Sequence, residues 1–149
     1  MTHELTAQVI LNEGLQFTGT AGSGYTVTMD APTPAGHGAG FMPMELVLIS
    51  LAGCSAMDVL AILRKKEQRV HSLDVRVRGQ RQEGSLSVFT AIALEYIVWG
   101  EDVDSTAVAR AIELSAERYC PVWKMLENTV AITSAFRVMS DAPILTPGD

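Results

Sequence analysis

The chain has 149 residues, of which 48% are apolar and 19% are charged, and its formal net charge is −6. This length fits one domain, and an acidic balance without any basic block argues against nucleic-acid binding, which requires a positive surface. The composition is rich in apolar side chains for a soluble chain of this size. We therefore expect a partner subunit to cover part of the apolar surface.

The amino-terminal part is predicted to form three short strands followed by a long loop. The strands are expected over residues 7–12, 15–21 and 24–30, which are separated by glycine-containing turns. Residues 31–43 are rich in proline and glycine, which is typical of a loop. The first ten residues carry an early acid and lack the apolar core of a signal peptide, so a cytoplasmic location is expected.

A long central helix is expected to begin at Pro43, because proline suits the first helical position. Residues 46–63 are apolar on nearly every side, which indicates a helix covered by neighbouring elements. Ser50, Ser55 and Asp58 interrupt the apolar run. We therefore interpret this segment as a buried helix and not as a membrane span.

The second half is predicted to contain a β-hairpin, two helices and a last strand. Alternation of apolar and polar residues predicts strands over 71–82 and 87–100. Helices are expected over residues 102–119 and 121–129, a strand over 131–139, and loose tails over 1–6 and 140–149. The order βββ-α-ββ-αα-β predicts a single α+β domain over residues 1–149, with antiparallel sheets around the long buried helix.

The two cysteines are the main candidates for chemistry, since cytoplasmic thiols stay reduced and seldom form structural disulfides. Cys120 stands directly before Pro121, which places it at the N-cap of the second predicted short helix. Unpaired backbone N–H groups and the helix dipole at that position are expected to favour the thiolate.

Cys54 lies within the central helix, with Ser50 and Asp58 four residues away on either side and therefore on the same face. A cysteine beside glycine and alanine is also typical of a small core residue, and both interpretations stay open. The two cysteines and three scattered histidines lack the spacing of a zinc motif. No metal is expected.

The segment PMELVLISLAGCSAMDVLAIL at residues 43–63, followed by AERYCPV at residues 116–122, resembles the OsmC/Ohr family of thiol peroxidases. The resemblance extends over Ala7–Val138 and is nearest to the YhfA-like branch of that family. It implies an OsmC-like fold and an intertwined homodimer whose active sites use Cys54 and Cys120.

The resemblance also implies a reaction, the reduction of organic hydroperoxides in oxidative stress defence. Cys54 would attack a small hydroperoxide and become a sulfenic acid, and Cys120 would then close a disulfide. An external dithiol or a lipoyl-bearing protein would reduce that disulfide. No bound cofactor, nucleic acid or membrane is expected to take part.

The chain departs from the family pattern near the central helix. Family peroxidases pair an amino-terminal arginine with a glutamate directly after the helix-opening proline, whereas this chain has no arginine before Arg64 and has Met44 in the glutamate position. We assign the catalytic acid to Glu45, one residue later and about 100° further round the helix. Met44, Ser50 and Asp58 are expected to bind substrate.

Two other functions remain open on the same scaffold. The chain is alternatively a thiol redox sensor or disulfide-exchange protein, or a dimer that holds a small apolar ligand beside Cys54 without catalysis. The missing arginine favours both alternatives, whereas the paired cysteines favour the two redox functions.

Overall fold

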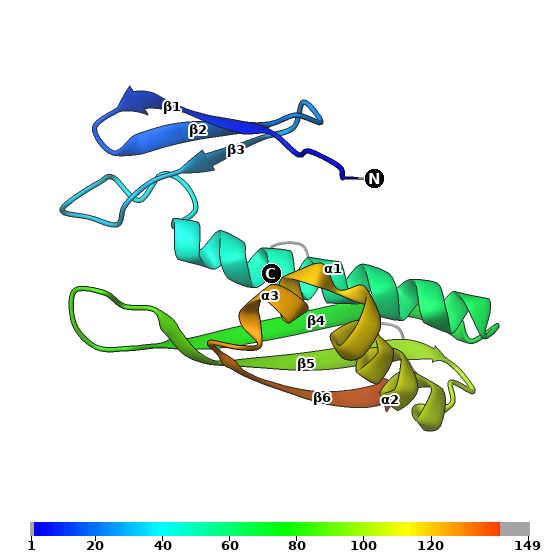
Figure 1. Ribbon diagram of the computed structural model, residues 1–149. Helices are drawn as coiled ribbons and strands as arrows, with labels where there is room; N and C mark the ends of the chain where they lie inside the picture. The colour runs from blue at the N-terminus through cyan, green and yellow to red at the C-terminus, as the bar shows by residue number, and fades with distance from the viewer. Residues whose placement is uncertain (1, 141–149) are drawn as a thin grey trace. The chain divides into compact units, whose positions relative to one another are not determined.

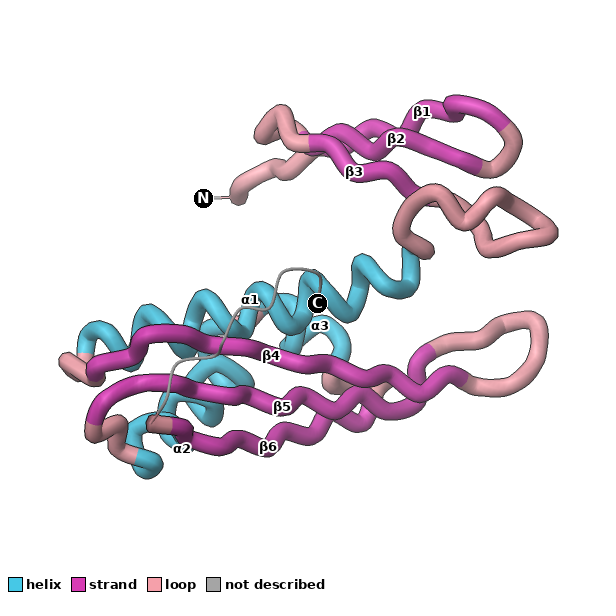
Figure 2. The backbone as a smooth tube through the Cα atoms, turned by 180° about the vertical axis from the view of Figure 1, so that it is seen from behind, coloured by secondary structure: helices cyan, strands magenta, loops and turns pink. Residues whose placement is uncertain are grey.

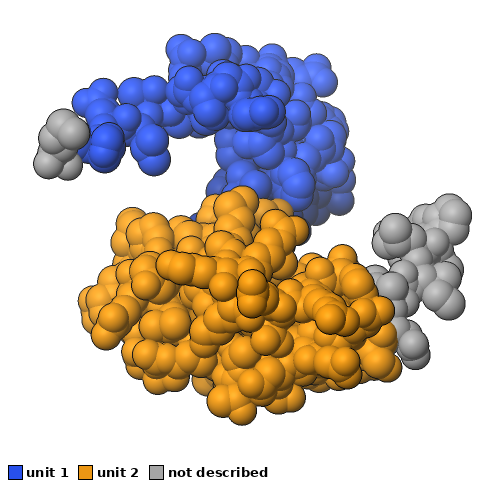
Figure 3. All heavy atoms as spheres, turned by 90° about the vertical axis from the view of Figure 1, so that its right-hand side faces the viewer, with its two compact units in different colours: residues 1–47 blue, residues 48–149 orange. Residues whose placement is uncertain are grey.

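The computed structural model describes residues 2–140. The chain divides into two compact units, Met1–Val47 and Leu48–Asp149, which are coloured separately in Figure 3 and are described here one at a time. Residues 2–6 have no regular secondary structure, and the rest of the expected carboxyl-terminal tail after Ser140 lies outside the described residues. The single domain over residues 1–149 stays a prediction.

The first unit contains the three predicted strands. They are β1 (Ala7–Glu13), β2 (Gln16–Ala21) and β3 (Thr26–Met29), which form one antiparallel sheet in chain order (Figure 1). Gly14 makes the turn between β1 and β2 with φ of 55°, a conformation that glycine adopts without steric cost. The glycine-bounded strands of the sequence analysis are confirmed.

The long loop after β3 is organised by Asp30, whose side chain is only 3% exposed. Its carboxylate accepts the backbone N–H groups of Ala31 at 2.7 Å, His37 at 3.2 Å and Ala39 at 3.1 Å. The bond from Ala39, with those from Ala31 and His37, lowers the pKa of Asp30 against the opposing effect of burial. One ionised side chain therefore fixes much of this Pro/Gly-rich loop.

An Asp30→Asn variant is expected to loosen the loop, because a neutral amide has one acceptor oxygen where the carboxylate has two. Hydrogen exchange of the His37 and Ala39 amides measures this, and faster exchange is expected at pH 7. Since the pKa is lowered in the folded state, the wild-type protection is present above the unfolded-state pKa and is lost as the pH falls through the folded value. Equal exchange in the wild type, in Asp30→Asn and in an exposed-site control, Glu13→Gln, would contradict this role.

The central helix α1 (Pro43–Lys65) begins with proline, as predicted. The Glu45 carboxylate accepts the backbone N–H of Met42 at 2.8 Å, which is the return bond of a capping box. Arg64 and Lys65 occupy the last turn, where positive charge suits the helix dipole.

The expectation that α1 is covered on most sides is not met within one chain. Its buried residues are Leu51, Ala52, Ser55, Val59 and Leu63. Other apolar positions remain open, since Met57 is 75% exposed and Ile49 is 49% exposed. By length and composition α1 is long and apolar enough to span a membrane, but its buried stripe packs in the core of the second unit.

The second unit is built on a sheet of β4 (Arg69–Arg81), β5 (Phe89–Glu101) and β6 (Ala131–Met139), with α1 running along it (Figures 1 and 2). Strands β4 and β5 are antiparallel, whereas β5 and β6 are parallel. The sequence analysis expected antiparallel sheets only. The difference arises because the chain between β5 and β6 passes through helices, and such a crossover returns the strand in the same direction.

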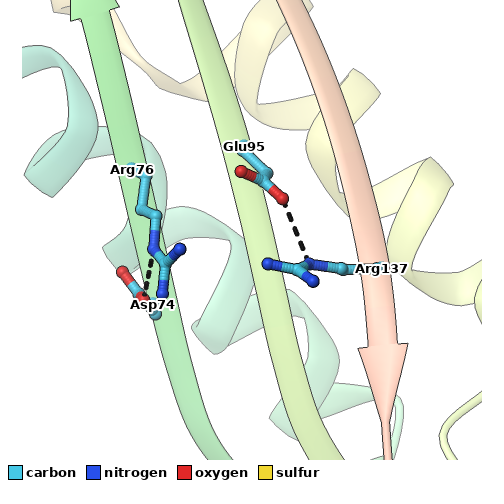
Figure 4. A network of polar contacts seen from close by, with 4 residues as sticks. All are labelled: Asp74, Arg76, Glu95 and Arg137. Carbon is cyan, nitrogen blue, oxygen red and sulfur yellow. Dashed lines mark hydrogen bonds and ion pairs between the residues drawn. The ribbon is translucent and has the colours of Figure 1, made fainter.

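The two faces of this sheet differ in polarity. On β5, Ile92, Leu94, Tyr96 and Val98 are each at most 2% exposed, and the Tyr96 hydroxyl meets α1 through Ser55. The opposite face carries two ion pairs, Arg76 with Asp74 at 2.9 Å and Arg137 with Glu95 at 3.1 Å (Figure 4). The core, and the chemistry described below, therefore lie on the α1 side of the sheet.

Candidate active site

The two cysteines meet in the second unit. The thiol sulfurs of Cys54 and Cys120 and a carboxylate oxygen of Asp58 all lie within 4.8 Å of one another. Cys54 is half-buried and Cys120 is 2% exposed, and both are free thiols. A disulfide requires a sulfur–sulfur distance of about 2.05 Å, so closing the pair requires a small side-chain movement.

Two different elements supply these groups. Cys54 and Asp58 lie one turn apart on α1 and project from the same face. Cys120 is the N-cap of α3 (Pro121–Leu126), with an extended backbone at φ −87° and ψ 102°. Its sulfur accepts the backbone N–H of Trp123 at 3.4 Å. The predicted N-cap position of the Cys-Pro pair is confirmed.

The approach of α3 depends on a break in the preceding helix. The sequence analysis expected one helix over residues 102–119, but α2 (Ser105–Leu114) ends early and a π-helical turn, η1 (Ser115–Tyr119), follows. The Cys120 N–H donates to the Ser115 carbonyl at 2.8 Å. This bond joins residues five apart in sequence, which is the pattern of a π-helix. Wide turns of this kind are frequent at functional sites, and here η1 carries Ser115 to the cluster.

A buried hydrogen-bonded chain runs beside the two thiols. The Ser115 hydroxyl donates to Asp58 at 3.0 Å, Ser55 and Ser115 are 2.9 Å apart, and Ser55 and Tyr96 are 2.6 Å apart. The direction of the chain is fixed because a carboxylate can only accept. Ser115 donates its hydroxyl hydrogen to Asp58, so it must accept a hydrogen bond from the Ser55 hydroxyl. Ser55 in turn accepts a hydrogen bond from the Tyr96 hydroxyl.

These hydrogen bonds give every buried hydroxyl of the three residues a partner, and a buried hydroxyl without one would destabilise the core. Ser55, Ser115 and Tyr96 are each 0% exposed, and within residues 2–140 no buried side-chain nitrogen or oxygen lacks a hydrogen-bond partner. Burial raises the pKa of Tyr96 to about 12, with smaller contributions from the charges of Cys120 and Asp58. The Tyr96 hydroxyl therefore keeps its proton and acts as the donor at the end of the chain.

The expected thiolate at Cys120 is not found. Burial, followed by contact with the Cys54 thiol and the charges of Cys54 and Asp58, raises the pKa of Cys120 to about 11. The Trp123 N–H lowers this pKa, as expected for an N-cap, but does not outweigh burial. The predicted N-cap geometry of Cys120 is confirmed, but the predicted thiolate is wrong because desolvation of the buried sulfur outweighs the effect of the cap.

The other predicted site residues take no part in the hydrogen-bonded chain of Asp58, Ser115, Ser55 and Tyr96. Ser50 is exposed and takes part in no side-chain hydrogen bond among the described residues. Met44 and Glu45 belong to the unit Met1–Val47, where Glu45 caps the start of α1. Their roles in catalysis and substrate binding stay predictions.

A groove of about 660 Å³ begins at Asp58 and runs along the carboxyl-terminal half of α1. It is lined by Asp58, Ala61, Ile62, Lys65, Lys66, Leu114 and Tyr119. The walls are mainly apolar, and the two lysines add positive charge at the end of the helix. This groove gives a small apolar molecule a route towards the Asp58 carboxylate.

Ser55, Tyr96 and Ser115 were not identified as functional from the sequence. Each carried a weak signal: Ser55 follows Cys54, Tyr96 lies in a largely apolar part of β5, and Ser115 follows an apolar helical face. Small polar residues in such places are common. Only the fold shows that the three hydroxyls join.

The sequence and fold are similar to those of known proteins. A family model described as OsmC-like protein matches residues 36–135. This chain belongs to the OsmC-like family. It is similar to Protein YhfA of Escherichia coli strain K12, with 43% identity over 140 residues that cover 90% of this chain and 98% of YhfA.

Solved structures share the fold. A hypothetical protein from Aquifex aeolicus has a TM-score of 0.84 and 28% identity, covering 95% of this chain and all of that chain. An organic hydroperoxide resistance protein OsmC from Legionella pneumophila has a TM-score of 0.70 and 12% identity, and the match covers 91% of this chain and 98% of that chain. At 12% identity the second likeness concerns the fold alone.

Alkylation of Cys120 is expected to depend on pH well above neutrality. Since the pKa of Cys120 is raised to about 11, its thiolate fraction keeps growing up to that pH. Brief labelling with iodoacetamide from pH 7 to pH 11, resolved for each cysteine by peptide mass spectrometry, measures the rate. A Cys120 rate that reaches its plateau near pH 8 would show that burial does not control this thiol.

The direction of the buried chain predicts unequal costs for two substitutions. Ser115→Ala removes the donor to Asp58 and the acceptor for Ser55, so we expect a loss of about 1–3 kcal/mol in the free energy of unfolding. Tyr96→Phe removes only a terminal donor, and Ser55 keeps its bond to Ser115, so its cost should be smaller. Urea unfolding compares the variants, and a larger loss for Tyr96→Phe would contradict the assigned direction.

Proposed function

We propose that this protein is a thiol-dependent peroxidase that reduces organic hydroperoxides with two cysteines. The observation that carries the proposal is the cluster of Cys54, Cys120 and Asp58, whose reactive atoms lie within 4.8 Å of one another. Two thiols at this distance suit a cycle in which one is oxidised and the other closes a disulfide. Membership of the OsmC-like family supports the same chemistry.

In the first step Cys54 is the nucleophile, because it is half-buried whereas Cys120 is 2% exposed. Its sulfur attacks the distal oxygen of the hydroperoxide, and the O–O bond breaks. The sulfur is oxidised to a sulfenic acid, and the departing alkoxide takes up the thiol proton and leaves as an alcohol. The Asp58 carboxylate has an oxygen within 4.8 Å of the Cys54 sulfur and can carry that proton.

In the second step Cys120 resolves the sulfenic acid. Its sulfur attacks the Cys54 sulfur, the S–O bond breaks, and the hydroxide leaves with the Cys120 proton as water. The raised pKa of Cys120 suits this order, since a protonated thiol does not compete for the peroxide. An external dithiol or a lipoyl-bearing protein then reduces the disulfide, and no bound cofactor is required.

The groove beside Asp58 supports a substrate with an apolar body. Its walls include Ala61, Ile62 and Leu114, and Lys65 and Lys66 suit a substrate that also carries a carboxylate. The volume of about 660 Å³ is that of a small-molecule site.

We also propose that the protein works as a homodimer in the cytoplasm. Apolar side chains are open on each unit taken by itself, including Val9 and Leu11 at 55% and Met57 at 75% exposure. Large apolar side chains in such numbers favour burial by a second copy.

A second candidate function, thiol exchange or redox sensing, is favoured by one observation. The chain has no arginine before Arg64 and so lacks the amino-terminal arginine that family peroxidases pair with a glutamate. A thiol pair without a cationic activator reacts slowly with peroxide but still exchanges with other disulfides. The groove equally suits a bound apolar ligand.

A single hydroperoxide challenge separates these functions. Reduced protein is treated briefly with less than one equivalent of cumene hydroperoxide, its remaining thiols are blocked, and the cysteines are mapped by non-reducing peptide mass spectrometry. A peroxidase gives a Cys54–Cys120 disulfide, and a Cys120→Ser variant stops at a Cys54 sulfenic acid that dimedone traps. A Cys54→Ser variant should leave Cys120 unoxidised.

Two unoxidised thiols after this challenge would contradict the peroxidase. If a small disulfide such as oxidised glutathione then still oxidises the pair, exchange or sensing is the function. A stoichiometric apolar molecule found by native mass spectrometry of the purified protein would instead favour ligand binding.

A further inference from the structure

We propose that the reduced cluster of Cys54, Asp58 and Cys120 binds a thiophilic divalent cation of the zinc class. The sequence analysis expected no metal, because the chain holds no zinc motif of closely spaced ligands. The fold removes that objection, since it brings one thiol from α1 and one from the N-cap of α3 to the same carboxylate.

The distances suit one bound ion. Zinc lies about 2.3 Å from thiolate sulfur and about 2.0–2.2 Å from carboxylate oxygen, so tetrahedral ligand atoms are roughly 3.5–3.8 Å apart. The three donor atoms here lie within 4.8 Å of one another before any ion draws them together. The movement required is smaller than that needed to close a disulfide, which brings the Cys54 and Cys120 sulfurs to about 2.05 Å.

Neighbouring groups hydrogen-bond to the candidate metal ligands, as groups around known metal sites do. Ser115 donates to the Oδ2 atom of Asp58 at 3.0 Å, which orients the carboxylate. Trp123 donates its backbone N–H to the Cys120 sulfur at 3.4 Å. Ser55 and Tyr96 continue the Ser115 chain into the core and fix that serine in turn.

The charge balance favours a cation in the cluster. Once an ion has displaced both thiol protons, two thiolates and one carboxylate carry three negative charges, and none of the ion pairs found within residues 2–140 includes Asp58. A divalent ion offsets two of these charges and so lowers the free-energy cost of ionising the buried Cys120 thiol. Two sulfur donors select zinc-class ions over magnesium or calcium, which prefer oxygen ligands.

A bound ion would compete with the redox chemistry, because both use the same sulfur lone pairs. Binding displaces two thiol protons, so the affinity should rise with pH. A disulfide between Cys54 and Cys120 has no thiolate left to donate, so oxidation should release the ion. The cluster would then exchange between a metal-bound resting form and a metal-free reactive form.

Cobalt titration of the reduced, chelator-treated full-length protein tests the site without any peroxide. Under anaerobic conditions, one Co²⁺ per chain should give a sulfur-to-cobalt charge-transfer band and the visible bands of a tetrahedral site, and Zn²⁺ should remove both. Cys54→Ser and Cys120→Ser should each weaken the charge-transfer band. Asp58→Asn should lower the affinity about 10-fold or more, and Ser115→Ala should lower it about 10- to 100-fold through Asp58.

Asp102→Asn is the matched control. Asp102 is exposed in the connection between β5 and α2, and this substitution removes one negative charge, as Asp58→Asn does. Thermal melting establishes that each variant is folded, and wild-type protein with both thiols alkylated replaces any cysteine variant that is not. Absence of a charge-transfer band in the wild type would overturn the proposal, as would equal affinity in Asp58→Asn and the control, or unchanged binding after alkylation. Peroxide reactivity of the metal-free protein is measured separately, so either proposal can fail alone.

Discussion

The arrangement of the site depends on the hydrogen bond from Ser115 to Asp58. It joins η1 to α1, and through Ser55 and Tyr96 it continues to β5, so one chain of hydroxyls ties the three elements that surround the thiols. Because the carboxylate can only accept, every bond in the chain has one allowed direction. The same bond holds Asp58 within 4.8 Å of both sulfurs.

Local sequence patterns predicted most of the elements but not all of their contacts. Proline at residue 43 and the Cys-Pro pair fixed two helix starts, because their preferences act within one turn. The parallel pairing of β6 was missed, since strand direction depends on the crossover and not on the residues of the strand. The π-helical turn at Ser115–Tyr119 was also missed, because no local residue pattern distinguishes it from the end of an α-helix.

The chemistry of the site was also predicted only in part, because it depends on contacts between residues that are far apart in the sequence. Resemblance to a family paired Cys54 with Cys120, whereas their positions in the chain alone left the pairing open. The protonation state of Cys120 was predicted wrongly: a helix N-cap lowers a thiol pKa, but burial acts over the whole environment and here has the larger effect. Tyr96, buried at 0% exposure, was assigned no role because a single hydroxyl in a strand has no local partner.

The proposed chemistry requires that Cys54 and Cys120 form one reversible redox pair. The most direct test equilibrates the protein in dithiothreitol buffers of stepped reduction potential, alkylates the thiols that remain, and weighs the intact chain. A reversible pair gives a single two-electron transition between a doubly alkylated form and an unalkylated form that is two hydrogens lighter than the reduced chain. Single alkylation, or double alkylation at every potential, would contradict it.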